Sequence, residues 1–490
     1  MGNSEASIKI GKRTFITAII ILAALMLTAG IMTKVIPAGS YDRVITDGRE
    51  IIQQGTYHLT EAEDYPAWRW LTAPFEVFGS EDGPTIIVII LFIFAIASAI
   101  SLLEKSGVMA AVLSKIVKRF IKKKYMLMAI IVFFFMLLGA VLGTFEENIA
   151  LVPIIIALAY SLKWDSMVGL GMSILASCFG FTSAITNPFS IAITQKISDL
   201  PLYSGTGFRI IIFIAYYALL MTFLLHYAKK IEKNPEKSLV YGEDQSLREK
   251  YSSDSSLEEA IGSKSEEESR NLDQAMTAFN IFIVLVFVLI VVASFIPGLA
   301  DVQLPLIGII FFIGSLFSAR KAGLKGKHAS KVLKDSVIGI APGIILILMA
   351  MSVKFIIASG GIMDTILYHA ANAISGTSPY IAILLIYLLI LVLELFVGSS
   401  SAKAFLIMPL IAPLSDLVGI TRQTSVLAFS FGDGFSNVLY PTNPVLLICL
   451  GLTIVAYPKW FKWTYKLQIA AFIMACIFLF IGVMIKYGPF

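Results

Sequence analysis

Long apolar stretches constrain this chain more than any other feature of its sequence. Several windows approach or reach the roughly 18 apolar residues that a helix needs to cross a bilayer, among them Phe15–Val35, Pro84–Leu103, Ile210–Leu225, Phe279–Ile296 and Ile469–Ile485. Only 14% of the 490 residues are charged, whereas soluble domains have about 25%. The alternating ten-residue pattern of barrel strands is absent. The sequence therefore predicts an all-α polytopic membrane protein.

The remaining composition argues against several classes of function. The net charge of +5 is interpreted as Lys and Arg at one membrane face, so no nucleic-acid partner is expected. Three cysteines lie in apolar segments without CxxC spacing, and four histidines lack metal-ligand spacing, so no metal site is predicted. No Gly-rich motif ending in Lys-Ser/Thr appears, which argues against ATP-driven transport by this chain.

Charge distribution gives a topology. Lys9, Lys12 and Arg13 precede the first apolar stretch, and the positive-inside rule then places the N-terminus in the cytoplasm. The loop over 37–83 is expected outside, with a small hairpin in "YDRVITDGREII" around its Asp-Gly turn. The stretch 230–275 is rich in Ser, Glu and Lys and is predicted to be a flexible cytoplasmic linker.

The chain repeats itself on either side of that linker. Gly143 matches Gly398, and Asn187-Pro188 matches Asn443-Pro444, at offsets of 255 and 256 residues. The basic flank of each matched segment changes sides between the halves. This predicts two inverted-topology repeats, as in many secondary transporters. We expect the first repeat over 1–229, and a linking helix plus the second repeat over 276–490.

Each predicted repeat has two polar interruptions, a hairpin tip and a Thr-Asn-Pro break, which predict discontinuous helices. Irregular backbone at membrane depth persists where it is buried or lines an aqueous cavity, so we expect all four interruptions to meet near the midplane and bind the substrate. Hairpins 125–164 and 380–418 are expected to re-enter the membrane, although full spans fit equally well. The candidate substrate-binding residues are Glu146, Glu147, Asn148, Thr186, Asn187, Ser399, Ser400, Ser401, Lys403, Asp433, Asn437, Thr442 and Asn443.

Structural explanations compete for several of these residues. The paired Glu146 and Glu147 could be solvated at the headgroups, and Asn148 is expected to cap the returning helix. Asp433 could bind a cation, take up a coupling proton or pair with Lys403. The serines could simply cap a helix. Outside this set, Glu394 and Lys354 are expected to snorkel or to pair locally.

Five stretches resemble a known family. "VIPAGSYDR", "GTFEENIALVPIIIALA", "ITNPFSIAITQ", "LPLYSGTGFR" and the long run from Ser399 to Pro444 are similar to the YfcC/ArcD branch of the DcuC-like C4-dicarboxylate carriers, in the ion transporter superfamily. The resemblance implies a secondary carrier of the bacterial inner membrane. It also implies a homodimer with hairpin tips and an elevator-like motion. Members are associated with basic amino acids, as in arginine/ornithine exchange, or with dicarboxylates.

The charge of the predicted site favours one of these substrates. Glu146, Glu147 and Asp433 against Lys403 leave a formal charge of −2, which repels a dianion unless cations or protons accompany it. A basic amino acid is therefore expected. A C4-dicarboxylate coupled to Na⁺ or H⁺ is the alternative, and another amino acid, a peptide or another organic acid stays open. A channel and a membrane-embedded enzyme built on Ser400 and His369 are remote alternatives. No cofactor beyond a coupling ion is expected.

Overall fold

The computed structural model describes residues 12–46, 49–53, 55–61, 65–80, 83–252, 266–293, 296, 299–324, 326–453 and 455–488. In this part of the chain, nine helices are long and apolar enough to cross a membrane. The two small sheets of the described residues have two strands each. The prediction of an all-α polytopic membrane protein is confirmed.

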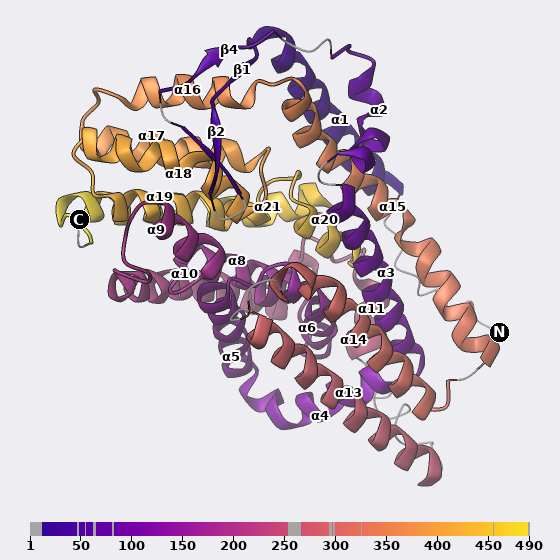
Figure 1. Cartoon of the computed structure of the whole chain (residues 1–490). Coiled ribbons are helices and arrows are strands. Elements are labelled where there is room, and N and C mark those ends of the chain that lie inside the picture. The colour runs from indigo at the N-terminus through magenta and orange to yellow at the C-terminus, as the bar shows by residue number, and fades with distance from the viewer. Residues whose placement is uncertain are drawn as a thin grey trace.

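One group of long helices lies on the right of Figure 1 and includes helices from both halves of the sequence. Its apolar stretches are continuous, so its members form long helices that pack lengthwise against one another. α3 contacts α14 and α15, α13 contacts α14, and α1 contacts α15. We call it the long-helix group: α1 (Lys12–Val35), α3 (Gly83–Lys105), α13 (Glu266–Ala293), α14 (Leu299–Lys321) and α15 (Gly326–Ser359).

The rest of the first half forms a bundle in the lower part of Figure 1, in which most helices are short or interrupted. α4 (Val108–Phe120) and η2 (Ile121–Lys123) carry the basic amphipathic segment that leads into it. Its elements are α5 (Lys124–Leu137), η3 (Leu138–Leu142), η4 (Glu147–Leu151), α6 (Val152–Ser161), α7 (Ser166–Leu170), η5 (Gly171–Leu175), α8 (Ala176–Ser183), η6 (Pro188–Ala192), α9 (Ile193–Ile197) and α10 (Thr206–Lys233).

The corresponding part of the second half lies above it in Figure 1, and the two bundles meet where α8 contacts α19. All of α8 is buried, and so is α19 from Gln423 onward. The elements of the upper bundle are α16 (Met363–Ile374), α17 (Pro379–Glu394), α18 (Ser400–Leu417), α19 (Arg422–Gly434), η8 (Phe435–Val438), α20 (Pro444–Gly451) and α21 (Tyr457–Met484).

Equivalent positions of the two sequence repeats contact each other at this junction. Cys178 Sγ donates to the carbonyl oxygen of Gly434 at 2.9 Å, across 256 residues. Tyr216 Oη also joins the two halves, by donating to the carbonyl oxygen of Ala471 at 3.1 Å. Contacts between equivalent positions are expected when two repeats are related by a two-fold axis that passes between them. The orientation of each repeat in the membrane stays a prediction.

The loop after α1 forms the predicted hairpin, a second pair of strands and a short helix. β2 (Arg43–Thr46) pairs antiparallel with β3 (Arg49–Ile52), around an Asp-Gly turn that lies outside the described residues. β1 (Gly39–Ser40) pairs with β4 (His58–Leu59), and α2 (Arg69–Glu76) and η1 (Val77–Gly79) follow. The Arg43 guanidinium binds both carboxylate oxygens of Asp364 in α16, at 2.9 and 2.8 Å. Both bonds come from Nη2, and this ion pair ties the loop to the second half.

Helices cover parts of the predicted linker 230–275. α10 continues to Lys233, and η7 (Pro235–Lys237) and α11 (Gln245–Ser252) follow it. Residues 253–265 lie outside the described residues, and α13 already begins at Glu266. Asp244, between η7 and α11, is buried. It accepts hydrogen bonds from the Ser166 amide (2.8 Å) and from Tyr160 Oη (2.9 Å).

Asp244 has a second carboxylate near it. Asp165 is also buried and accepts hydrogen bonds from Tyr227 Oη and Ser238 Oγ, both at 2.7 Å. Burial, with a further contribution from the charge of Asp165, raises the pKa of Asp244 to about 7. The docking of this segment against the ends of α6 and α7 therefore involves a carboxyl group that titrates near neutral pH.

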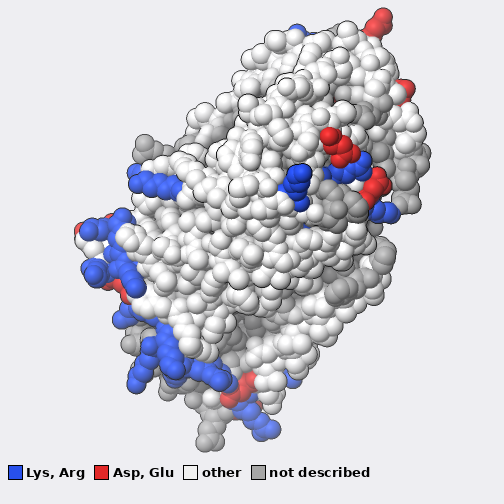
Figure 2. Space-filling model, turned by 90° about the vertical axis from the view of Figure 1, so that its left-hand side faces the viewer, with Lys and Arg blue, Asp and Glu red and all other residues white. Residues whose placement is uncertain are grey.

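Charged side chains are unevenly distributed on the surface. On the face drawn in Figure 2, Lys and Arg gather along the lower left edge, and most of the remaining described surface is uncharged. The exposed basic residues of α4 and η2 include Lys118, Arg119, Lys122 and Lys123. An uncharged belt bordered by cations is the pattern of a protein that spans a bilayer.

Candidate functional site

The first hairpin tip begins where α5 loosens into the π-helical turn η3 and stops at Gly143. Gly143 has a φ of +70°, in the left-handed region that favours glycine. A Cβ at this position would lie 2.4 Å from Asn187 Oδ1. The backbone of the tip therefore approaches the Thr-Asn-Pro break closely, and the glycine permits both the turn and the contact.

The first break completes the hydrogen bonding of that tip. Thr186 donates from its amide to the carbonyl oxygen of Ala140 (3.0 Å) and from Oγ1 to that of Val141 (3.2 Å). Asn187 Nδ2 donates to the carbonyl oxygen of Gly139 at 3.4 Å. These three carbonyl groups lie at the end of a helix, where they lack intrahelical donors. The two interruptions of the first half thus form one structural unit.

The doubled Thr-Asn-Pro sequence has the same local structure in both halves. Asn187 Oδ1 accepts from the amides of Phe189 (2.9 Å) and Ser190 (3.1 Å). Asn443 Oδ1 accepts from those of Val445 (3.0 Å) and Leu446 (3.2 Å). In each case proline occupies the first helical position, where its missing amide costs nothing. The asparagine ends the break and starts the next helix, so the predicted discontinuous helices are present.

The paired glutamates of the first tip differ in exposure. Glu146 is exposed, whereas Glu147 is buried and accepts a hydrogen bond from the amide of Phe145 at 3.1 Å. Asn148 is not the helix cap that the sequence predicts, because it lies inside η4. Its Nδ2 donates to the carbonyl oxygen of Thr144 (3.0 Å) and to Ser177 Oγ (2.9 Å). Asn148 Oδ1 is buried and has no hydrogen-bond partner in the described part of the chain.

The second tip carries hydroxyl groups and starts α18. Ser399 is exposed and caps this helix, accepting from the amide of Ala402 at 3.4 Å. Ser400 Oγ lies 2.5 Å from Asp433 Oδ2 and 3.4 Å from the carbonyl oxygen of Phe189. Ser401 is half-buried. Because Phe189 belongs to η6, the second tip reaches the helix that follows the first break.

A buried ion-pair cluster lies directly behind the second tip. Lys403 Nζ is 2.8 Å from Asp433 Oδ1 and also pairs with Glu394, and all three side chains are buried. They come from α18, α19 and α17 respectively. A buried ammonium is stable only beside opposite charge. We call these three residues the lysine cluster; its carboxylates exceed its ammonium by one formal charge.

The second break is attached to this cluster through asparagines. Asn437 Nδ2 donates to the carbonyl oxygens of Asp433 and Gly434. Asn437 Oδ1 accepts from Asn443 Nδ2 at 2.6 Å. Thr442 Oγ1 is buried without a hydrogen-bond partner in the described residues. α20, which follows the second break, contacts η4 of the first tip. The structure thus brings elements from all four interruptions together.

Glu394 is the residue that sequence reasoning left out of the site. Local pairing was one expectation for it, and the structure shows this pairing, but with a candidate site residue. The feature of the sequence that indicates this pairing is the position of Glu394, nine residues before Lys403 and on the other side of the tip. Lys354 lies on α15, in the long-helix group. Among the described residues, no group of three or more His, Cys, Asp or Glu side chains is placed to hold a metal ion.

The sequence is similar to a known protein family and to proteins of two bacteria. The sequence model of the C4-dicarboxylate anaerobic carriers, DcuC, matches residues 15–484. The chain is 30% identical to the Escherichia coli K12 protein named "Putative basic amino acid antiporter YfcC", over 94% of both chains. It is 25% identical to an uncharacterized Haemophilus influenzae protein, over 94% of this chain and 95% of that one.

Two solved transporters align with the chain at low similarity. The Alcanivorax borkumensis YdaH transporter covers 97% of this chain and 99% of its own, with 15% identity and a TM-score of 0.40. Neisseria gonorrhoeae MtrF, described as an antimetabolite efflux pump, covers 95% of this chain and 94% of its own. Its identity is 15% and its TM-score 0.39.

A polytopic helical bundle with interrupted helices, matched over nearly its whole length by a carrier family, is a membrane transport protein and not an enzyme. The chain belongs to the DcuC family of C4-dicarboxylate anaerobic carriers. The family resemblance noted in the sequence is thereby confirmed.

Proposed function

We propose that this protein is a secondary carrier of the bacterial inner membrane that exchanges basic amino acids, such as arginine and ornithine. One observation carries the choice of substrate. Lys403, the single cation among the candidate residues, pairs with Glu394 and Asp433. It therefore has no free charge to offer a substrate carboxylate. The exposed Glu146 beside Glu147 gives the remaining site a negative charge, which suits a cationic side chain.

Polar groups for the other end of an amino acid are also near. Ser399, Asn187 and Asn443 start three helices at the tips and breaks. The N-terminal ends of helices favour anions such as an α-carboxylate. A substrate lying between these helix ends and Glu146 would satisfy both of its charged ends. The antiporter name of the Escherichia coli relative supports the same substrate class.

A C4-dicarboxylate is the second candidate, and the description of the family favours it. The same three helix starts could accept its carboxylates. The tip glutamates would then need Na⁺ or protons to offset their charge. Cation dependence of transport therefore separates the two proposals.

Counterflow in proteoliposomes tests the proposal. Vesicles are loaded with unlabelled ornithine, arginine, succinate or buffer, and external labelled arginine or succinate is followed with and without Na⁺. Ornithine-driven arginine accumulation without Na⁺ is expected. Succinate uptake that requires Na⁺ or a proton gradient, with no arginine counterflow, would contradict the proposal.

Two variants connect the function to the tip. Glu146→Gln should raise KM for arginine about tenfold or more, because one favourable ion pair of about 1.4 kcal/mol is lost. Glu147→Gln should lower counterflow strongly while the protein stays folded. Glu236→Gln, an exposed carboxylate of η7, is the matched control. Unchanged kinetics in both tip variants would remove the paired glutamates from the site.

A further inference from the structure

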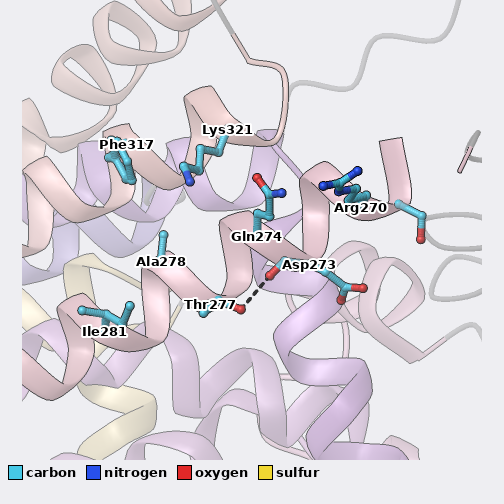
Figure 3. A pocket seen from close by; sticks show the side chains of 9 residues that line it. Arg270, Asp273, Gln274, Thr277, Ala278, Ile281, Phe317 and Lys321 are labelled. Atoms are coloured by element: carbon cyan, nitrogen blue, oxygen red, sulfur yellow. Dashed lines mark hydrogen bonds between the residues drawn. The ribbon is translucent and has the colours of Figure 1, made fainter. Parts of the chain in front are cut away.

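A groove on the long-helix group is lined by none of the residues of the four interruptions. A cavity of about 650 Å³ lies between the first turns of α13 and the last turns of α14. Figure 3 shows Phe317 and Lys321 on α14 facing Gln274 and Ala278 on α13. Both helices are candidate membrane spans, so this groove lies at one end of two neighbouring spans.

The lining of the groove changes from charged to apolar along α13. Arg270 and Gln274 line it near the start of the helix, and Lys321 lies at the matching end of α14. Further along, Ile281 and Phe317 line it with side chains that are 56% and 47% exposed. Arg270 and Ile281 are separated by about 16 Å along the helix axis. A phospholipid has this same sequence of a charged headgroup followed by an apolar chain.

The charge of the groove is positive. Its one carboxylate, Asp273, pairs with Lys115 of α4 at 3.1 Å. Asp273 therefore does not pair with Arg270 or Lys321, which are the two cations of the lining. Lys321 Nζ lies 5.3 Å from the centre of the Phe317 ring, which keeps the ammonium close to the apolar part of the groove.

The neighbouring polar groups define what the groove can bind. Thr277 Oγ1 donates to the carbonyl oxygen of Asp273 at 2.9 Å (Figure 3), so it offers no hydrogen to a ligand. Gln274 is exposed, and Figure 3 shows it between Lys321 and Arg270. The charge pattern of the sequence predicts that this end faces the cytoplasm, the side whose leaflet carries a negative surface potential.

We propose that this groove binds an anionic phospholipid of the cytoplasmic leaflet. Arg270 and Lys321 bind the headgroup phosphate, Gln274 hydrogen-bonds to the headgroup, and one acyl chain lies against Ile281 and Phe317. Basic pockets between spanning helices at this depth are a recurrent type of lipid site. The proposal does not depend on the transported substrate, because none of these residues belongs to the candidate transport site.

Native mass spectrometry of the purified full chain tests the proposal. The protein is titrated with phosphatidylglycerol, with phosphatidylcholine of the same chains, and with glycerol 1-phosphate. We expect phosphatidylglycerol to bind about tenfold more tightly than phosphatidylcholine. The double variant Arg270→Gln/Lys321→Gln should lose this preference, and Arg270→Lys/Lys321→Arg should retain most of it.

The matched control is Lys118→Gln/Arg119→Gln, which removes two exposed cations of α4 that do not line the groove. It should keep the preference. Equal binding of the two lipids by the unmodified protein would overturn the proposal. So would equal losses in the groove variant and the control. If glycerol 1-phosphate displaces phosphatidylglycerol at a comparable concentration, the groove binds free phosphates, and the lipid assignment is wrong.

Discussion

Asn187 and Asn443, 256 residues apart, start their helices with the same pair of hydrogen bonds. Each side-chain oxygen accepts from the amides two and three residues further on. Each asparagine also donates from Nδ2, to the carbonyl oxygen of Gly139 in one half and to Asn437 in the other. The two repeats therefore share the capping role of the asparagine Oδ1, whereas the asparagine Nδ2 binds a different group in each repeat.

Removing either capping oxygen should cost stability. Asn187→Ala and Asn443→Ala should each lower the free energy of unfolding by about 1–2 kcal/mol, because two helix-start amides lose their acceptor. Asn→Ser at the same positions keeps an acceptor and should recover part of the loss. Melting temperatures in detergent measure the effect. Equal melting of the alanine and serine variants would argue that the caps contribute nothing.

The two matched tip glycines should respond differently to alanine. Gly143 has a positive φ, and its added Cβ would clash with Asn187 Oδ1. Gly398 has no other atom within 4 Å of the added Cβ and no positive φ. Gly143→Ala should therefore reduce stability by at least about 1–2 kcal/mol and impair counterflow. Gly398→Ala should change neither. Comparable effects in the two variants would contradict the close approach of the first tip and break.

The charges of the lysine cluster predict which of its neutral variants loses more stability. Lys403→Gln leaves two buried carboxylates without their cation and should destabilise the protein by about 3–5 kcal/mol. Glu394→Gln leaves one carboxylate paired with one ammonium and should cost much less. Thermal unfolding and the yield of monodisperse protein measure both. A Glu394→Gln variant less stable than Lys403→Gln would show that this charge count does not govern the cluster.

The docking of α11 should depend on pH through Asp244. Its pKa in the docked state, about 7, exceeds the ordinary value of 3.8 because of burial. Docking is therefore most stable below about pH 4 and loses stability as the pH rises through 7. Hydrogen exchange, corrected for the intrinsic pH dependence of its rate, should show weaker protection of Gln245–Ser252 at pH 8 than at pH 5.5. Asp244→Asn should remove this difference, and Asp273→Asn, at an exposed site, should not.

The sequence predicted what depends on local chemistry. The Asp-Gly turn in 43–52 indicated the hairpin, and the two Thr-Asn-Pro sequences indicated the helix breaks, because Asn and Pro have few acceptable places in a helix. It did not predict that Glu394 meets Lys403, or that Asp244 is buried. Those outcomes depend on how helices rotate and pack against one another, which hydropathy does not record.

The ion pair between Arg43 and Asp364 joins two parts of the chain that are synthesised at different times. The two residues are 321 positions apart, and a ribosome adds about 5–20 residues per second. The partner of Arg43 is therefore made roughly 15–65 seconds after Arg43 itself. Until then the hairpin of 43–52 has only its own turn and short strands to hold it. The contact between this loop and α16 can therefore form only late in synthesis, after most of the chain has been made.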